Sequence, residues 1–307
     1  MSKYIAVFPG REAFYKGLSK SFYREYKIVR DIFKEASTFM GEDLEYICYE
    51  NPNVKPELHT TCLITHCYAM YNALGQTLPS PLGVAGFSQG EFTALAIAQS
   101  LRFPQVLELV YRLESLIYRS PIIMDGKMMR VVGLQTRELE KCCKEVDTKC
   151  EKVTIAIYLS DEQNIISGDK KAVEKVADMA KKRGARWIID LNSIGTFHSP
   201  LCQSILRESD VIFDQYNFSD AQLPVYCCID GRPWVKGLDL KSRLTVQIAR
   251  SVQWSKVIKN IRHQGIKHIV EIGPGCTVSG NSRLADPDME CVWINDTRGI
   301  GELKATI

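Results

Sequence analysis

Residues 81–98, PLGVAGFSQGEFTALAIA, decide how the centre of the chain folds. Two prolines break the preceding helical pattern, and the apolar run LGVAGF predicts a short buried strand. The segment GEFTALAIAQS then predicts a helix that begins at once. Ser88 therefore stands in a G-x-S-x-G turn between a strand and a helix.

This turn has the pattern of a nucleophile elbow. A tight strand-to-helix turn strains the backbone at Ser88, so the flanking residues, Gly86 and Gly90, have to be small. The N-terminus of the helix favours negative charge beside the serine, and the N–H of Gln89 is the first expected oxyanion donor. We therefore favour a nucleophilic serine over one that only caps the helix.

A nucleophilic serine needs a base, because its hydroxyl is protonated at neutral pH. The sequence offers five histidines: His59, His66, His198, His263 and His268. His198 lies in the loop NSIGTFHSPL, and loops at strand ends commonly carry catalytic side chains. We predict His198 as the base, and the other four as structural or exposed. Asp190 is a candidate to orient it by chain order alone.

Strands and helices alternate along most of the chain, which predicts a mostly parallel sheet with helices on its faces. The expected strands are KYIAVFPG at 3–10, LGVAGF at 82–87 and KHIVEIGPG at 267–275, with a strand pair or turn at 223–234. The expected helices run through about residue 48, over 58–76 and over 240–265.

Residues 127–191 follow a different order. Their segments predict strand, helix, strand, strand, helix and strand, which is the ferredoxin-like pattern. We therefore expect a small subdomain over 127–191, inserted into a larger α/β domain formed by residues 1–126 and 192–307.

The composition argues against several classes of protein. A formal charge of +3, from 39 basic and 36 acidic side chains, is too small for a nucleic-acid-binding surface. The basic stretch at 181–186 is interpreted as a solvated helix end. There is no signal-peptide pattern and no apolar run of about 18 residues, so we expect a cytoplasmic protein without a membrane segment. The eleven cysteines are scattered without a C-x-x-C spacing, which favours reduced thiols over disulfides or zinc.

Several motifs, in one order, resemble those of the malonyl-CoA:acyl carrier protein transacylases and of the acyltransferase domains of polyketide synthases. GFSQGE resembles the family's G-H-S-x-G-E, GTFHSPL its histidine element and VQIARSVQW its Q-L-x-x-P-V-Q-W, while DGKMMRVVGL and NIISGDKKAVE resemble two further segments. The resemblance runs from VFPG at 7–10 to EIGPG at 271–275. It implies a hydrolase-like, parallel-sheet α/β domain with an inserted ferredoxin-like subdomain.

The resemblance implies a role for each matching residue. Ser88 would take the acyl group from a thioester, and His198 would activate the serine. The backbone carbonyl of Gln247, rather than a carboxylate, would orient the histidine. Arg112 would pair with the free carboxylate of malonate, which its forked guanidinium matches bidentately.

Three positions beside the expected site depart from the family's pattern. Arg11 replaces the glutamine whose backbone N–H completes the oxyanion hole with that of Gln89, and this N–H survives the substitution. Glu12 replaces a glycine of the same loop and is expected to tighten it. Phe87 replaces the histidine before the nucleophile and is expected, together with Phe197, to form the wall of the acyl pocket.

The resemblance implies an acyltransferase that moves a malonyl or related short acyl group from coenzyme A, through an acyl-serine, to the phosphopantetheine thiol of an acyl carrier protein. Polyketide or fatty acid biosynthesis is the expected setting. Coenzyme A enters as part of the substrate, and we expect a monomer with no permanent cofactor, no metal and no nucleic-acid or membrane partner. Phe197 favours a malonyl-type acyl group, whereas Gln89 is common in methylmalonyl-type members.

Two alternatives stay open. An editing hydrolase would clear acyl groups from carrier proteins, and the presence of Arg112 counts against it because an unpaired guanidinium would repel uncharged chains. A non-catalytic docking subunit for carrier proteins is less favoured, because Ser88, His198 and Arg112 occur together.

Overall fold

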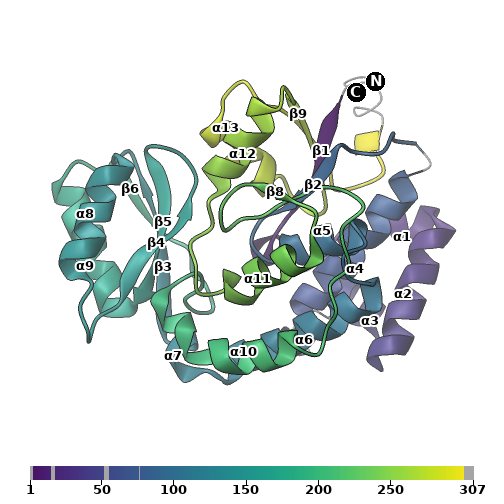
Figure 1. The fold of residues 1–307 in the computed structure, drawn as a ribbon, viewed down its shortest axis with the longest axis horizontal. Coiled ribbons are helices and arrows are strands. Elements are labelled where there is room, and N and C mark those ends of the chain that lie inside the picture. The colour runs from purple at the N-terminus through teal and green to yellow at the C-terminus, as the bar shows by residue number, and fades with distance from the viewer. Residues whose placement is uncertain (1–2, 15–17, 52–54, 76, 301–307) are drawn as a thin grey trace.

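The computed structural model describes residues 3–14, 18–51, 55–75 and 77–300, which form two β-sheets with helices packed around them (Figure 1). The larger sheet has the strand order β10-β9-β1-β2-β7-β8. Its strands are β1 (Tyr4–Phe8), β2 (Gly83–Gly86), β7 (Val225–Tyr226), β8 (Pro233–Trp234), β9 (His268–Ile272) and β10 (Glu290–Ile294). β7 and β8 pair antiparallel and all other neighbours pair parallel, which confirms the predicted sheet and strand pair.

β1 and β2 bring the start of the chain to the Ser88 turn. Every residue of both strands is buried, as expected for parallel strands covered on both faces. Phe8 lies opposite Gly86 in their register, so the two strands end at the same level. The loop after β1 therefore meets the turn after β2, where Phe87 N donates to Phe8 O at 2.9 Å.

Helices pack against this sheet, and α5 is buried along its whole length because it lies between the sheet, α4 and α6. The helices of this part are α1 (Ser21–Glu25), α2 (Lys27–Met40), α3 (Leu44–Tyr49), α4 (His59–Leu74), α5 (Gly90–Ile97), α6 (Phe103–Arg119), α7 (Pro121–Met124), α10 (Leu206–Phe213), α11 (Gly237–Gln247), α12 (Trp254–His263) and α13 (Thr277–Ala285). Short 3₁₀ turns are η1 (Arg11–Ala13), η2 (Pro56–Leu58) and η3 (Pro200–Ile205). Within the described ranges, the helices are all too short or too polar to cross a membrane.

The second sheet lies at one end of the molecule, in teal in Figure 1. Its strand order is β4-β5-β3-β6 with antiparallel neighbours, and α8 and α9 pack against it over a separate apolar core. Its elements are β3 (Gly126–Val132), α8 (Thr136–Val146), β4 (Val153–Tyr158), β5 (Gln163–Asp169), α9 (Lys170–Lys182) and β6 (Trp187–Asp190). The order of elements predicted within 127–191 is confirmed.

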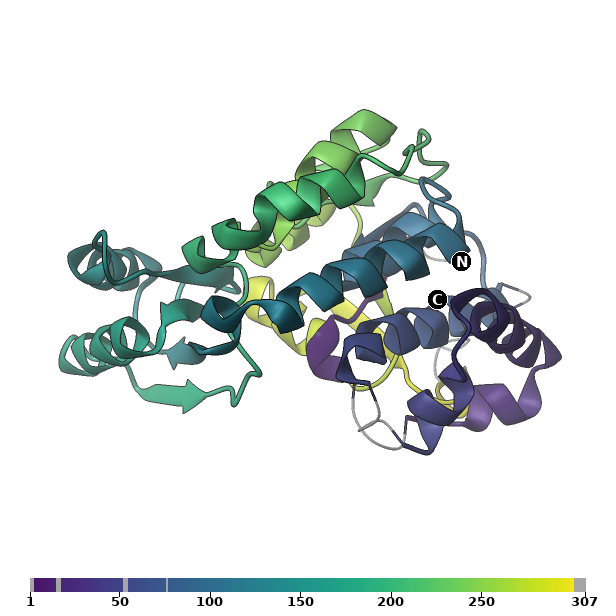
Figure 2. The same cartoon turned by 90° about the horizontal axis from the view of Figure 1, so that it is seen from below.

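The segment between α11 and α12 joins the two sheets. Val252 N donates to Ala156 O at 2.8 Å, and Tyr158 N donates to Val252 O at 2.9 Å, so Val252 pairs with β4. Figure 2 shows α6 and α10 running side by side toward the second sheet. This pair of helices forms a second connection between the two parts.

The single helix predicted over 240–265 is wrong. α11 ends at Gln247 and α12 begins at Trp254, with an irregular segment between them. The apolar pattern is helical along the chain, but the pairing of Val252 with β4 requires extended backbone, and this long-range contact overrides the local preference. The break also leaves the carbonyls of Ile248 and Arg250 outside a continuous helix.

Candidate active site

Ser88 lies at the sharp turn between β2 and α5, with a left-handed backbone φ of 54°. A Cβ added at Gly86 would lie 1.9 Å from the backbone carbon of Gly90, and one at Gly90 would lie 2.3 Å from the Phe8 carbonyl oxygen. Both positions therefore have to be glycine for the turn to close. The elbow geometry predicted from the sequence is present.

His198 comes from the loop that follows β6 and precedes η3. Its Nε2 lies 2.6 Å from Ser88 Oγ. Its φ is 55°, and its backbone N–H donates to the Ile248 carbonyl at 2.8 Å. The structure thus brings together the serine and the histidine predicted as nucleophile and base, although they are 110 positions apart.

Two backbone carbonyls hold the other side of the His198 ring. Nδ1 donates to Gln247 O at 3.0 Å and to Arg250 O at 3.2 Å. Because a carbonyl only accepts, the ring proton is on Nδ1, and the lone pair of Nε2 faces Ser88. Burial lowers the pKa of His198, against the opposing effect of these two hydrogen bonds. The neutral ring, which can take a proton from Ser88, is therefore favoured.

Asp190 does not orient His198, so that candidate is wrong. It is exposed at the end of β6, on the second sheet, and its carboxylate lies 2.9 Å from Lys127 Nζ. Chain order alone suggested Asp190, and chain order does not determine the direction in which a side chain at the end of a strand points.

The other four histidines lie on elements other than the loop that carries His198. His66 in α4 is buried, with its Nδ1 2.9 Å from the Tyr49 hydroxyl, and burial lowers its pKa to about 4. His59 begins α4, His268 begins β9, and His263 is exposed at the end of α12.

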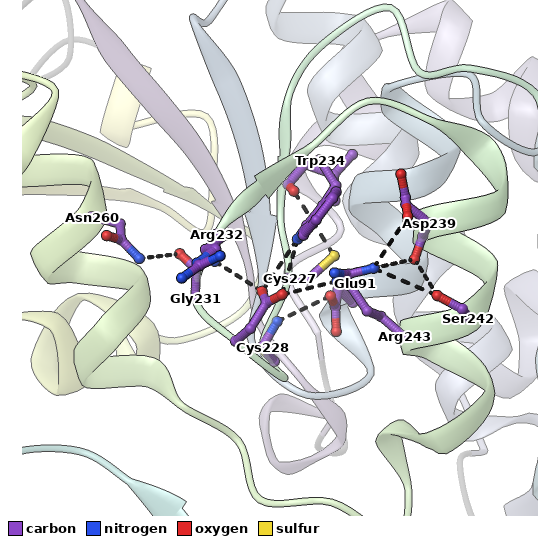
Figure 3. Close-up of polar contacts among 12 residues, drawn as sticks. Glu91, Cys227, Cys228, Gly231, Arg232, Trp234, Asp239, Ser242, Arg243 and Asn260 are labelled. Atoms are coloured by element: carbon purple, nitrogen blue, oxygen red, sulfur yellow. Dashed lines mark hydrogen bonds and ion pairs between the residues drawn. The ribbon is translucent and has the colours of Figure 1, made fainter.

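The side chain of Gln247 ties α11 to the elbow. Its Nε2 donates to the Ser88 carbonyl at 3.0 Å and also to the carboxylate of Glu91. Glu91, in the first turn of α5, accepts from Cys228 N at 3.1 Å (Figure 3). Glu91 is fully buried, and this burial raises its pKa to about 7. Glu91 was not among the residues predicted for the site, although a carboxylate within GFSQGE, directly after the turn, was a usable signal.

A polar cluster beside Glu91 fixes α11 against β8 (Figure 3). The Arg243 guanidinium lies over the Trp234 ring, with Cζ 3.4 Å from its centroid. Arg243 Nε and Trp234 Nε1 both donate to Asp230 Oδ2, at 2.9 Å and 3.1 Å. These contacts, one of them a cation–π contact, hold α11 one turn before Gln247.

The loop after β1 lies directly against the elbow. A Cβ added to Gly10 would lie 2.6 Å from Phe87 O and 3.4 Å from Ser88 Cβ. Within the described residues, the backbone N–H groups of Arg11 and Gln89 donate no turn or loop hydrogen bond. Both remain able to donate to an oxygen that develops negative charge beside Ser88.

The Arg11 guanidinium is bound by acceptors from three directions. Nε donates to Gln89 Oε1 at 3.3 Å, Nη1 donates to Tyr118 OH at 3.2 Å, and Nη2 donates to Glu114. The guanidinium also lies over Phe197, 5.0 Å from the ring centroid. Gln89 and Phe197 are the sequence neighbours of the two reactive residues, so Arg11 lies beside the site.

The prediction that Arg112 reaches the site is wrong. Its Nη1 donates to Gln215 Oε1 at 2.7 Å and lies 3.5 Å from Tyr216 OH, both just after α10. Positions two apart on a helix point about 200° apart, so Arg112 and Glu114 leave α6 on opposite sides. The spacing from Ser88 along the chain does not determine which side of α6 faces the elbow. The buried α6 residue that contacts Gln89 and Arg11 is Glu114, which was not predicted from the sequence.

Phe87 belongs to the apolar core beneath the elbow. Its side chain is buried and packs edge-on against Trp254 of α12, with centroids 5.3 Å apart. Phe197 is partly buried and lies under the Arg11 guanidinium. Of the two expected wall residues, Phe197 is therefore the one with a polar contact beside the site.

The chain is similar to known proteins along nearly its whole length. It is 27% identical over 311 residues to the malonyl CoA-acyl carrier protein transacylase of Haemophilus influenzae, which covers 99% of both chains. It is 28% identical over 293 residues to the transacylase of the same name from Escherichia coli, covering 93% of this chain and 94% of the relative. No protein-family model matches the chain.

Solved structures share the fold. The malonyl CoA-acyl carrier protein transacylase of Coxiella burnetii has a TM-score of 0.92 at 27% identity, covering 100% of this chain and 98% of that one. A malonyl-transacylase in complex with a type II polyketide synthase acyl carrier protein has a TM-score of 0.92 at 26% identity, covering 99% of both chains. The chain is therefore similar to the malonyl CoA-acyl carrier protein transacylases in sequence and in fold.

Proposed function

We propose that the protein is an S-acyltransferase that moves malonyl, or a related short acyl group, from coenzyme A to the phosphopantetheine thiol of an acyl carrier protein. The 2.6 Å contact between Ser88 Oγ and His198 Nε2, at an elbow turn, is the observation that carries this proposal. The names of the similar transacylases support these substrates. The relative bound to a carrier protein supports a setting in polyketide or fatty acid biosynthesis.

In the first half-reaction, Ser88 Oγ attacks the thioester carbonyl carbon while its proton passes to His198 Nε2. The carbonyl oxygen becomes an oxyanion and accepts hydrogen bonds from the N–H groups of Gln89 and Arg11. The carbon–sulfur bond then breaks, and His198 returns the proton to the leaving sulfur. The products are acyl-Ser88 and free coenzyme A.

The second half-reaction runs the same steps with the other thiol. The phosphopantetheine thiol gives its proton to His198 and attacks the ester carbonyl of acyl-Ser88. The oxyanion forms again at the same two N–H groups. The carbon–oxygen bond breaks, Ser88 Oγ takes the proton from His198, and the acyl group leaves on the carrier protein.

The carbonyls of Gln247 and Arg250 are sufficient to orient His198 for this exchange. In the second half-reaction His198 takes the proton of a thiol, which ionises near pH 8.5 in water and so demands less of a base than an alcohol does. A neutral carbonyl holds the ring in the required tautomer without the added negative charge of a carboxylate. This is the role that the resemblance implied for Gln247.

An editing hydrolase is the second candidate. Arg112 was expected to bind a carboxylated acyl group and so count against hydrolysis of uncharged chains, but its guanidinium points toward α10. If water replaced the thiol in the second half-reaction, acyl-Ser88 would be released as a free acid by the same groups.

For the molecule as a whole, we propose a monomer whose residues 1–126 and 192–307 form the hydrolase-like catalytic domain, with residues 127–191 as the inserted ferredoxin-like subdomain. Coenzyme A is part of the substrate in this reaction, which needs no permanent cofactor or metal.

Intact-mass measurement tests the function. The protein is incubated with malonyl-CoA, acetyl-CoA or a longer acyl-CoA, with and without a phosphopantetheinylated carrier protein. An acyl adduct that is absent from Ser88→Ala and moves to the carrier protein supports the transferase. Rapid release of free acid from an acyl carrier protein supports the hydrolase instead. No adduct with any thioester contradicts both enzymes and leaves the docking subunit.

A further inference from the structure

The ion pair between Arg11 and Glu114 is a charged feature beside Ser88 to which the proposed reaction assigns no role. The Glu114 side chain is 1% exposed and that of Arg11 is 17% exposed. Arg11 belongs to η1, directly after β1, and Glu114 to the last third of α6. The pair therefore joins the expected oxyanion loop to the helix that packs beside the elbow.

The surroundings of Glu114 suit an ionised carboxylate. One oxygen accepts from Arg11 Nη2, and the other accepts from Gln89 Nε2, with the Thr60 hydroxyl 3.2 Å away. Each of these groups donates, and an ionised carboxylate only accepts. A buried negative charge requires a nearby cation, and Arg11 supplies it.

Three of the five N–H groups of Arg11 already donate within the protein, one from each nitrogen. A guanidinium binds a carboxylate bidentately through two neighbouring N–H groups. Its Nε and Nη2 are already occupied by Gln89 and Glu114, and Nη1 donates to Tyr118. An incoming carboxylate therefore meets a guanidinium that is already engaged at all three nitrogens.

The positive charge of Arg11 and the negative charge of Glu114 already cancel. An acyl group that ends in a carboxylate would bring a second negative charge beside Glu114, where burial weakens the screening by water. Like charges that face each other across a binding surface oppose association. An uncharged acyl group leaves the balance intact and can pack against the ring of Phe197, which lies under the Arg11 guanidinium.

We infer that Glu114 determines the acyl specificity of this site, which accepts short uncharged acyl groups, such as acetyl or propionyl, in preference to malonyl. The inference rests on the proposed transfer through Ser88 and names its substrate class. The chemistry at Ser88 and His198 is unchanged, and the selection for a free carboxylate is lost because Glu114 neutralises the cation beside it.

The wild-type protein gives the first test. The rates of Ser88 acylation by acetyl-CoA, propionyl-CoA and malonyl-CoA are compared by intact mass over a range of concentrations. We expect kcat/KM for the uncharged donors to exceed that for malonyl-CoA by roughly tenfold or more, because of the like-charge penalty. Equal values, or a preference for malonyl-CoA, would overturn the inference.

The variant Glu114→Gln gives the second test. It keeps the shape of the side chain, removes the negative charge and leaves the charge of Arg11 unbalanced. The ratio of malonyl to acetyl acylation is expected to rise roughly tenfold. Glu108→Gln is the matched control, because it makes the same chemical change at an exposed position of α6. An unchanged ratio in Glu114→Gln, or the same rise in the control, would overturn the inference.

The double variant Arg11→Gln with Glu114→Gln removes both charges and keeps the backbone N–H of residue 11. It is expected to accept acetyl groups without any gain for malonyl, since the gain in Glu114→Gln depends on the freed guanidinium. A gain for malonyl in the double variant contradicts the inference. If none of the thioesters acylates the wild-type protein, the proposed function fails, whereas preferential malonylation of Ser88 contradicts the specificity alone.

Discussion

Ser88 and His198 are both non-glycine residues in the left-handed region of backbone conformation, with φ of 54° and 55°. Such conformations cost free energy and persist only where the surroundings impose them. The close approach of Gly86 to Gly90 imposes the turn at Ser88, and the hydrogen bond to the Ile248 carbonyl holds the backbone of His198. The strain at each residue aims one side chain at the other.

The acylation rate is expected to depend on the protonation of His198. Burial holds the pKa of His198 below its ordinary value of 6.5. Only the neutral ring accepts the Ser88 proton, so the rate should rise with pH and level off with a midpoint below 6.5. Initial rates of acyl-Ser88 formation at a series of pH values measure this midpoint. A midpoint above 6.5 in the free enzyme is incompatible with a desolvated base.

Glu91 is expected to make stability fall as pH rises. Its pKa is raised by burial from 4.5 to about 7, so the folded state binds a proton that the unfolded state has already lost in this interval. The contribution to the free energy of unfolding is fully present below pH 4.5 and is lost as pH rises through about 7. The loss reaches about 3 kcal/mol at most.

Urea denaturation of the wild type and of Glu91→Gln, at several pH values, isolates this contribution. The amide does not titrate, so the difference in free energy of unfolding between the two proteins should change between pH 4.5 and about 7 and stay constant outside that interval. Parallel curves for the two proteins would show that Glu91 keeps an ordinary pKa in the folded state.

The irregular segment between α11 and α12 links the second sheet to the base. Val252 pairs with β4, while the carbonyls of Gln247 and Arg250 accept from His198 Nδ1. If the segment were helical, as its sequence pattern suggests, Val252 could not pair with β4. The break in the helix therefore allows the same segment to pair with β4 and to hold the ring of His198.

Val252→Pro tests this link, because proline removes the N–H that donates to Ala156 O at 2.8 Å. The free energy of unfolding is expected to fall by roughly 1–3 kcal/mol, the cost of a buried acceptor without a partner. Acyl-Ser88 formation should fall as well, because the carbonyls that orient His198 shift. Val252→Ala is the control, since it shortens the side chain but keeps the N–H. Equal loss of acylation in both variants would assign the effect to packing.

Elements with a strong local pattern were predictable from the sequence. β1, β2, the Ser88 turn and the alternating order within 127–191 all follow from apolar runs and glycine positions. The break after Gln247 was not predictable, because its cause is a hydrogen-bonded pairing with a strand about 95 residues earlier in the chain. Glu114 was missed and Arg112 misplaced for one reason: a one-dimensional spacing does not set the rotation of α6 about its axis.

At the scale of the whole molecule, the loop that carries His198 contacts both the second sheet, through Thr196, and the Ser88 turn after β2. Thr196 anchors this loop to the second sheet. Its hydroxyl lies 2.6 Å from Ser167 Oγ on β5, and its N–H donates to Ile123 O at 2.8 Å. A Cβ added at Gly126 of β3 would lie 2.3 Å from Thr196 Cβ, so the loop approaches the sheet closely there. These contacts of Thr196 couple the position of His198, two residues later, to that of the second sheet.

Thr196→Val and Thr196→Ser separate the anchoring hydroxyl from the shape of the side chain. Valine leaves the buried hydroxyls of Ser167 and Ser199 without this partner, so we expect unfolding to become easier by about 1–2 kcal/mol. Acyl-Ser88 formation should fall roughly tenfold, since small displacements of a base are costly. Serine keeps the hydroxyl and should restore most of the rate, although it loses a buried methyl group. The rate of acylation and the midpoint of urea unfolding are measured for both variants. If Thr196→Val keeps the rate while Thr196→Ser loses it, the methyl group, and not the hydrogen bond to β5, holds the His198 loop against the second sheet.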